Sequence, residues 1–108
     1  MTTNTTDDSN VVANITTSTV LDTWNKIESN TAKYLVRLTD ESGNFQVVEY
    51  VITTDGTDIY TSEYGLIIKT TALGSFDFDI VGNTVRMLFN PVEGSTVRAR
   101  IYKTLLAI

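Results

Sequence analysis

The sequence predicts an all-β fold: an antiparallel β-sandwich of the jelly-roll type, or a small closed barrel, of about eight strands. Three observations predict it. Residues that favour extended backbone, above all Thr, Val, Ile, Tyr and Phe, dominate the chain after residue 10. Hydrophobic and polar residues alternate along several short segments, as they do in strands with one buried face. Turn-forming residues separate these segments at regular intervals, which is typical of sandwiches and barrels.

The alternation is clearest in residues 75–81, where Phe76, Phe78 and Ile80 share one face of an extended segment. The remaining strands are expected near residues 11–21, 32–40, 45–54, 57–64, 66–71, 84–90 and 95–106. The same periodicity predicts a mostly buried core of Val36, Phe76, Phe78, Ile80, Val85, Met87 and Ile101. Only residues 21–32 show helical spacing, so one short helical turn is expected there.

Turn signals fall between the expected strands. Asp55-Gly56 is a strong hairpin signal, because a tight turn of this kind needs positive φ angles. Gly82-Asn83 predicts a second hairpin, and Pro91 predicts the end of a strand because it lacks a backbone N–H group. Asp55 also begins a segment that resembles a calcium loop, but the further ligands of that motif are missing, which favours a turn.

The chain of 108 residues is expected to form one domain over residues 11–108, preceded by a flexible polar arm over residues 1–10. The arm has no apolar residue after Met1, so it cannot bury enough apolar surface to offset its ordering entropy. We therefore expect it to become ordered by contact with another subunit.

Composition narrows the function. The sequence contains no cysteine and no histidine, which excludes disulfides and thiolate metal sites and removes the usual general base. The net charge is −5, and no cluster of Lys and Arg stands out, so nucleic acid is not an expected partner. No apolar run approaches the length of a membrane span, so no membrane partner is expected either. We expect no cofactor, no metal and no catalytic residues.

Two carboxylates stand two residues apart, at Asp77 and Asp79. Glycoside hydrolysis uses two carboxyl groups that face each other across a substrate, but a half-exposed strand also carries alternating acids. Pairing with arginines, across strands or across subunits, is the better functional interpretation. The residues expected to face outward or into an interface are Asp77, Asp79, Arg86, Arg98, Arg100 and Tyr102.

Aromatic residues recur at strand positions, among them Tyr34, Tyr50, Tyr60 and Tyr64. An aromatic row on a sheet could bind sugars or stack on bases. Core filling is the favoured interpretation, because most of these positions fall on the apolar face of their segment.

Residues 16–102 contain a series of short motifs that follow one another in a fixed order. The motifs are Ala32-Lys33-Tyr34-Leu35-Val36; Asp55-Gly56-Thr57 followed by Tyr60 and Glu63-Tyr64-Gly65; Leu73-Gly74-Ser75-Phe76-Asp77 with Asp79-Ile80; and Gly82-Asn83 with Val85-Arg86. With them the chain resembles small virion structural domains of tailed phages that infect marine cyanobacteria. It departs from that pattern at Phe78, where a small residue is expected, and at Thr54, where a histidine is common.

The resemblance implies a structural part of a phage particle. It implies a capsid decoration or cement protein, or a small tail or baseplate component, located in the virion. The implied partners are major capsid or tail proteins and the chain itself, as a trimer. Two rival hypotheses remain: a receptor- or carbohydrate-binding module of a tail fibre, and a small hydrolase that uses Asp77 and Asp79.

Overall fold

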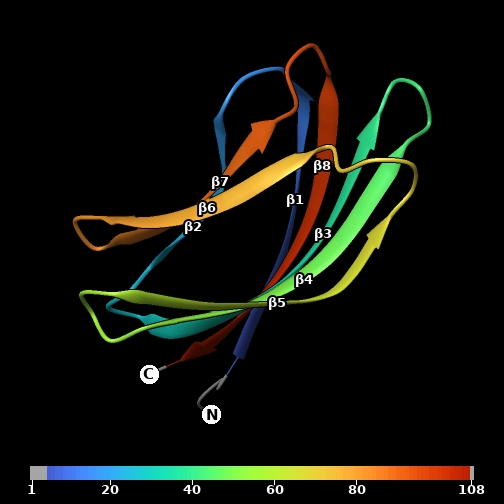
Figure 1. Ribbon diagram of the computed structural model, residues 1–108. Coiled ribbons are helices and arrows are strands. Elements are labelled where there is room, and N and C mark those ends of the chain that lie inside the picture. Colours follow the sequence, from blue (N-terminus) through green and yellow to red (C-terminus); the bar gives the residue numbers. More distant parts are fainter. Residues whose placement is uncertain (1–4, 108) are drawn as a thin grey trace.

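The computed structural model describes residues 5–107, which form eight strands connected by turns and loops (Figure 1). The strands are β1 (Thr5–Ile15), β2 (Thr19–Asn25), β3 (Ser29–Asp40), β4 (Phe45–Thr54), β5 (Ile59–Ile68), β6 (Gly74–Val81), β7 (Thr84–Pro91) and β8 (Val97–Ala107). Within this part of the chain there is no helix that could cross a membrane.

The strands form two antiparallel sheets that pack face to face. The large sheet has the order β1-β8-β3-β4-β5 and the small sheet the order β2-β7-β6. Figure 1 shows the small sheet lying across one face of the large sheet, with the start of β1 beside the end of β8. The edge strands of the two sheets do not pair with each other, so the structure is a sandwich and not a closed barrel. The predicted all-β sandwich of eight strands is therefore confirmed.

The core lies between the sheets and is built from the inward positions of each strand. Val36, Val85, Met87 and Ile101 are fully buried, as the alternation predicts. The predicted core residues of β6 are different, since Phe76, Phe78 and Ile80 are only half-buried although they pack against the core. The reason is position, because β6 is the edge strand of the smaller sheet.

Three segments of the chain are assigned differently from the sequence-based expectation. Residues 57–64 and 66–71, expected as two strands, form the single strand β5, because Gly65 with a φ of 63° makes a bulge and does not end the strand. Residues 11–21, expected as one strand, are divided between β1 and β2. The helical turn expected within residues 21–32 is wrong, because residues 21–25 belong to β2, residues 26–28 form a turn between strands, and residues 29–32 begin β3.

The polar N-terminal segment also differs from the expected arm. Residues 5–10 form the first half of β1 and pair with β8 of the same chain, from Thr5 opposite Leu106 to Asn10 opposite Ile101. Main-chain hydrogen bonds to a neighbouring strand need no apolar side chain, which is why composition alone did not indicate this strand. The rest of the expected arm, residues 1–4, lies outside the described residues.

A buried ion pair joins the two sheets. A bulge at Leu21 shifts the alternation of β2 so that Asp22 lies opposite Met87 and faces inward. Lys103 Nζ of β8 lies 2.9 Å from Asp22 Oδ2 and donates a hydrogen bond to the Thr23 carbonyl at 3.0 Å. The Tyr34 hydroxyl of β3 donates to the same carboxylate oxygen at 2.9 Å. Burial, together with the adjacent Asp22 carboxylate, raises the pKa of Tyr34, so the phenol stays protonated and remains a donor.

This ion pair predicts a large effect of removing one partner. Asp22→Ala leaves the Lys103 ammonium, only 9% exposed at its side chain, without a counter-charge. We expect a loss of about 3–5 kcal/mol in the free energy of unfolding, measured by urea denaturation. The double variant Asp22→Leu, Lys103→Met is expected to recover most of that loss, because it removes both buried charges. A single variant as stable as the original chain would contradict the role assigned to the pair.

Candidate functional site

A groove with a volume of about 500 Å³ opens between β5 of the large sheet and β6 of the small sheet. These edge strands belong to different sheets, so the space between the two layers is open to solvent at this side. The groove is lined by Tyr50, Ile59, Thr61, Glu63, Phe76, Asp77 and Phe78. Its floor is therefore mainly aromatic and its rim carries two carboxylates.

Tyr50 is the centre of the groove floor. Its ring packs edge-on against Phe76 and Phe78, with centroid distances of 5.3 and 5.2 Å. Its hydroxyl donates a hydrogen bond to Glu63 Oε1 at 3.2 Å. Burial raises the pKa of Tyr50, and the nearby Glu63 carboxylate raises it further, so the hydroxyl remains a donor and Glu63 an acceptor. Aromatic rings beside carboxylates can hold a sugar ring or the cationic end of an arginine side chain.

The two carboxylates of β6 that the sequence singled out have separate partners. Asp79 lies opposite Arg86 across the β6–β7 hairpin and forms a bidentate pair with it, Nε to Oδ1 at 2.7 Å and Nη2 to Oδ2 at 2.6 Å. These hydrogen bonds from Arg86 hold the pKa of Asp79 below its usual range. Asp77 accepts a hydrogen bond from Asn90 Nδ2 at 2.9 Å. The cross-strand pairing considered for Asp79 and Arg86 is thus observed, whereas a general acid of the glycosidase type requires a raised pKa.

The other three predicted interface residues lie on a different surface. Arg98, Arg100 and Tyr102 project from the outer side of β8, on the face of the large sheet that points away from the small sheet. Arg37 of β3 lies directly opposite Arg100, and Thr39 lies opposite Arg98. The three arginines and Thr39 line a hollow of about 160 Å³. The six residues therefore divide into two surfaces and do not form one site.

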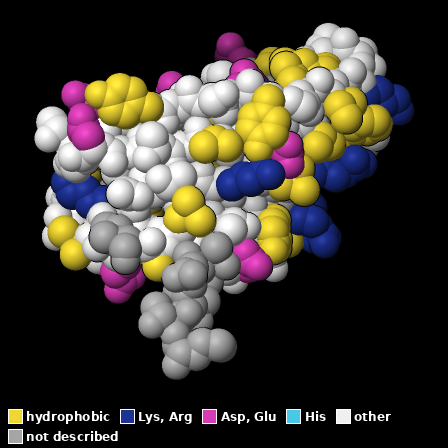
Figure 2. All heavy atoms as spheres, turned by 90° about the horizontal axis from the view of Figure 1, so that it is seen from below, with side chains coloured by type: hydrophobic (Ala, Val, Ile, Leu, Met, Phe, Trp, Pro, Cys, Tyr) yellow, Lys and Arg dark blue, Asp and Glu magenta, His cyan; other side chains and the backbone are white. Residues whose placement is uncertain are grey.

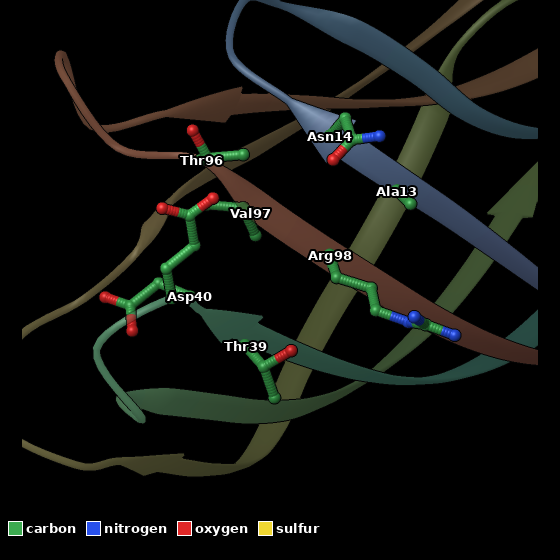
Figure 3. A pocket seen from close by; sticks show the side chains of 8 residues that line it. Ala13, Asn14, Thr39, Asp40, Thr96, Val97 and Arg98 are labelled. Carbon is green, nitrogen blue, oxygen red and sulfur yellow. The ribbon is translucent and has the colours of Figure 1, made fainter.

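A further hollow, of about 220 Å³, lies at one end of the large sheet (Figure 3). The Asp40 carboxylate there is already engaged by its own turn, because Oδ1 accepts from the N–H groups of Ser42 and Asn44 at 2.9 Å each. The hydrogen bond from the Asn44 side-chain amide, together with these backbone bonds, holds the pKa of Asp40 below its usual range. In Figure 3 the Arg98 side chain extends away from Asp40. Asp40 and Arg98 therefore do not point toward a common ligand position in this hollow.

Two further expectations can be compared with the structure. The aromatic residues Tyr34 and Tyr50 are buried, but Tyr60 and Tyr64 are 55% and 37% exposed, so core filling is wrong for these two. They lie on β5, an edge strand whose two faces are only thinly covered. The turn interpretation of Asp55 is supported, because its Oδ1 accepts from the N–H groups of Thr57 and Asp58.

Sequence reasoning did not identify Arg37, Glu63 or Lys103 as important. Lys103 had a detectable signal, because it continues the inward positions Val97, Ala99 and Ile101 of β8. A cation on an otherwise apolar face indicates a buried partner. Arg37 and Glu63 gave no such signal, since the role of each depends on residues of a neighbouring strand that are distant in the sequence.

A similar fold occurs within part of one larger phage protein, a tailspike. The tailspike protein of Acinetobacter phage vB_ApiP_P1 matches with a TM-score of 0.60 and 20% sequence identity, over 94% of this chain and 22% of that one. The tailspike proteins of the Acinetobacter baumannii phages AM24 and Fri1 match with TM-scores of 0.49, at 12% and 10% identity, over 97% of this chain and 26% and 20% of theirs. The Fri1 protein is a capsular polysaccharide depolymerase.

The first of these matches shows a shared fold and not a shared activity. The chain spans about a quarter or less of the tailspikes that it matches. No protein-family profile matches the chain, and no curated protein sequence matches it significantly. The match to the first tailspike places this sandwich fold within at least one phage tail protein.

The Asp79–Arg86 pair gives a direct test of the local electrostatics. Replacing Arg86 with Gln removes the cationic donor, so the pKa of Asp79 should rise toward its ordinary value. When the pKa of a carboxyl group is lower in the folded state than in the unfolded state, ionisation of that group stabilises the fold at any pH above the unfolded-state pKa. This contribution to stability is lost as the pH falls through the folded-state pKa. Titration of the Asp79 carboxyl carbon by NMR measures the shift. Arg98→Gln is the matched control and should leave the pKa of Asp79 unchanged.

Proposed function

We propose that this chain is a non-catalytic structural module of a phage tail component. The observation that carries the proposal is the fold likeness to a segment of a phage tailspike, which spans nearly all of this chain at a TM-score of 0.60. It agrees with the virion structural role that the order of the sequence motifs implies. The sequence motifs left open whether the protein belongs to the capsid or to the tail of the particle. The structural similarity to a tailspike favours the tail.

The surface of β5 supports a role in assembly. Leu66, Ile67 and Ile68 are three consecutive apolar residues, and all are exposed on an edge strand. An edge strand of ten residues with exposed apolar side chains invites pairing or packing with another chain. Such a strand suits a domain whose native state includes neighbours, and trimeric assembly and contacts with other tail proteins belong to the proposal.

The proposal predicts where the protein is found. Antibodies raised against the recombinant chain should label tails, and not capsid shells, in immunogold electron microscopy of the phage that encodes it. Mass spectrometry of separated tails and capsids should place its peptides in the tail fraction. Peptides confined to the capsid fraction would favour a decoration protein, and absence from purified particles would contradict any virion role. A cyanobacterial host remains a prediction of the resemblance alone.

A second candidate function is a receptor- or carbohydrate-binding module. The observation that favours it is the aromatic floor of the β5–β6 groove with Glu63 and Asp77 at its rim. Aromatic faces combined with hydrogen-bond acceptors are common where proteins hold sugars, and the groove volume is in the range of small-ligand sites.

This candidate is tested by titrating the labelled protein with oligosaccharides prepared from the host surface. Binding in the groove should shift the amide signals of Tyr50, Thr61 and Phe76, and Glu63→Gln should weaken binding about tenfold by removing a charged acceptor. Glu28→Gln, in the turn after β2, is the matched control and should bind normally. Unchanged signals across the oligosaccharide series would rule out this candidate.

A further inference from the structure

The outer face of the large sheet combines exposed apolar and basic side chains. Val11, Leu35 and Tyr102 are exposed there on adjoining strands β1, β3 and β8. Arg37 and Arg100 lie between them, at directly opposite positions of β3 and β8, and the guanidinium of Arg37 lies 4.7 Å from the ring centroid of Phe45. Figure 2 shows dark-blue and yellow side chains gathered on the face seen from below. We call the set Arg37, Arg98, Arg100, Leu35 and Tyr102 the arginine face.

Charge is unevenly distributed between this face and the rest of the molecule. Of the eight cations in the sequence, four lie at outward-facing positions of the large sheet, namely Lys33, Arg37, Arg98 and Arg100. Of the thirteen acids, only Asp7 and Glu49 lie there. The face therefore carries a net charge of +2, and the remainder of the chain carries −7 within the total of −5. An acidic protein that concentrates its cations on one exposed apolar sheet face has a surface suited to an acidic partner.

Within the described residues, the three arginines of this face form no ion pair. Among residues 5–107 the ion pairs are Arg86–Asp79 and Lys103–Asp22, so the guanidinium groups of Arg37, Arg98 and Arg100 are not paired with a carboxylate. Like charges at directly opposite positions of neighbouring strands are unfavourable. A two-fold contact of the face with itself would set one positive surface against another. A contact between different surfaces of two copies would neutralise them.

The β5–β6 groove has the complementary chemistry. Its partly exposed Phe76 and Phe78 rings can stack on guanidinium groups, and the carboxylates of Glu63 and Asp77 can accept their N–H donors. We propose that the arginine face of one copy of this chain docks on the β5–β6 groove of a second copy. The two surfaces lie on different sides of the molecule, one on the outside of the large sheet and one at the opening between the sheets, so a single chain cannot bring them together.

The contact that results is heterologous, because each copy contributes two different surfaces. Repetition of such a contact closes into a ring when the rotation between copies allows it and otherwise continues as a filament. This proposal does not depend on a phage origin. It differs from the carbohydrate-binding candidate because it assigns the groove to an arginine-bearing protein surface.

The experiment is a charge exchange followed by sedimentation velocity. The original chain should self-associate at about 0.05 M salt and dissociate at about 0.5 M salt, because exposed ion pairs are screened. Arg37→Glu with Arg100→Glu alters the arginine face, and Glu63→Lys with Asp77→Lys alters the groove. Each double variant alone should weaken association at least about 100-fold by placing like charges together. A mixture of the two variants should associate again, because the glutamates introduced on the arginine face of one variant then meet the lysines introduced in the groove of the other.

Two controls make the outcome decisive. Glu28→Lys with Glu93→Lys changes the net charge as much as the groove variant, but at exposed turns away from both surfaces, and it should associate like the original chain. Thermal unfolding followed by circular dichroism establishes that every variant is folded. A folded original chain that stays monomeric at low salt overturns the proposal, and so does a mixture that fails to associate. Dissociation of the original assembly by neutral oligosaccharides would instead assign the groove to sugar binding.

Discussion

The inward-facing Lys103–Asp22 pair is the interaction that fixes how the two sheets face each other. Hydrophobic packing between the sheets is non-directional and by itself allows one sheet to shift across the other. The ion pair and the Tyr34 hydroxyl connect β8, β2 and β3 at one defined position, and each polar atom involved has a partner. Because breaking such a network leaves a charge in the protein interior, shifted arrangements of the sandwich are disfavoured by several kcal/mol, at about the magnitude expected for buried pairs.

The same strand that carries Lys103 also sets the chemistry of the outer face. Along β8, Val97, Ala99 and Ile101 face the core while Arg98, Arg100 and Tyr102 face outward. A register slip of one residue would move the arginines into the core and the aliphatic side chains into solvent. The stability of the core and the exposure of the arginine face therefore both depend on the alternation of inward and outward residues along β8. β8 also lies inside the large sheet, where it pairs with both β1 and β3 although it is the last strand in sequence.

How much the sequence revealed depended on whether a feature was local. Strand β4 and the Gly82-Asn83 hairpin were predicted at their observed positions, because period-two alternation and turn residues act over a few neighbouring positions. The alternation of β6 gave the correct faces but too much burial for Phe76 and Phe78, since burial depends on which sheet covers a strand. Residues 5–10 could not be assigned to a strand because their partners in β8, from Leu106 opposite Thr5 to Ile101 opposite Asn10, lie far away in the sequence. The groove could not be predicted from the sequence, since Glu63 and Phe76 line the same groove only after the two sheets have stacked.

The groove follows from the unequal width of the two sheets. Five strands face three, and with strands spaced about 4.8 Å apart the large sheet is wider by about 10 Å. The inner side of β5 is thus left partly uncovered, and its inward positions Thr61 and Glu63 are polar and exposed where a fully covered strand would have apolar residues. Tyr50 on the next strand adapts to this boundary by burying its ring against Phe76 and Phe78 while its hydroxyl reaches Glu63 at the rim. A sandwich with three strands in each sheet would close this edge and lose the groove, so the aromatic and acidic site is a direct consequence of the five-to-three architecture.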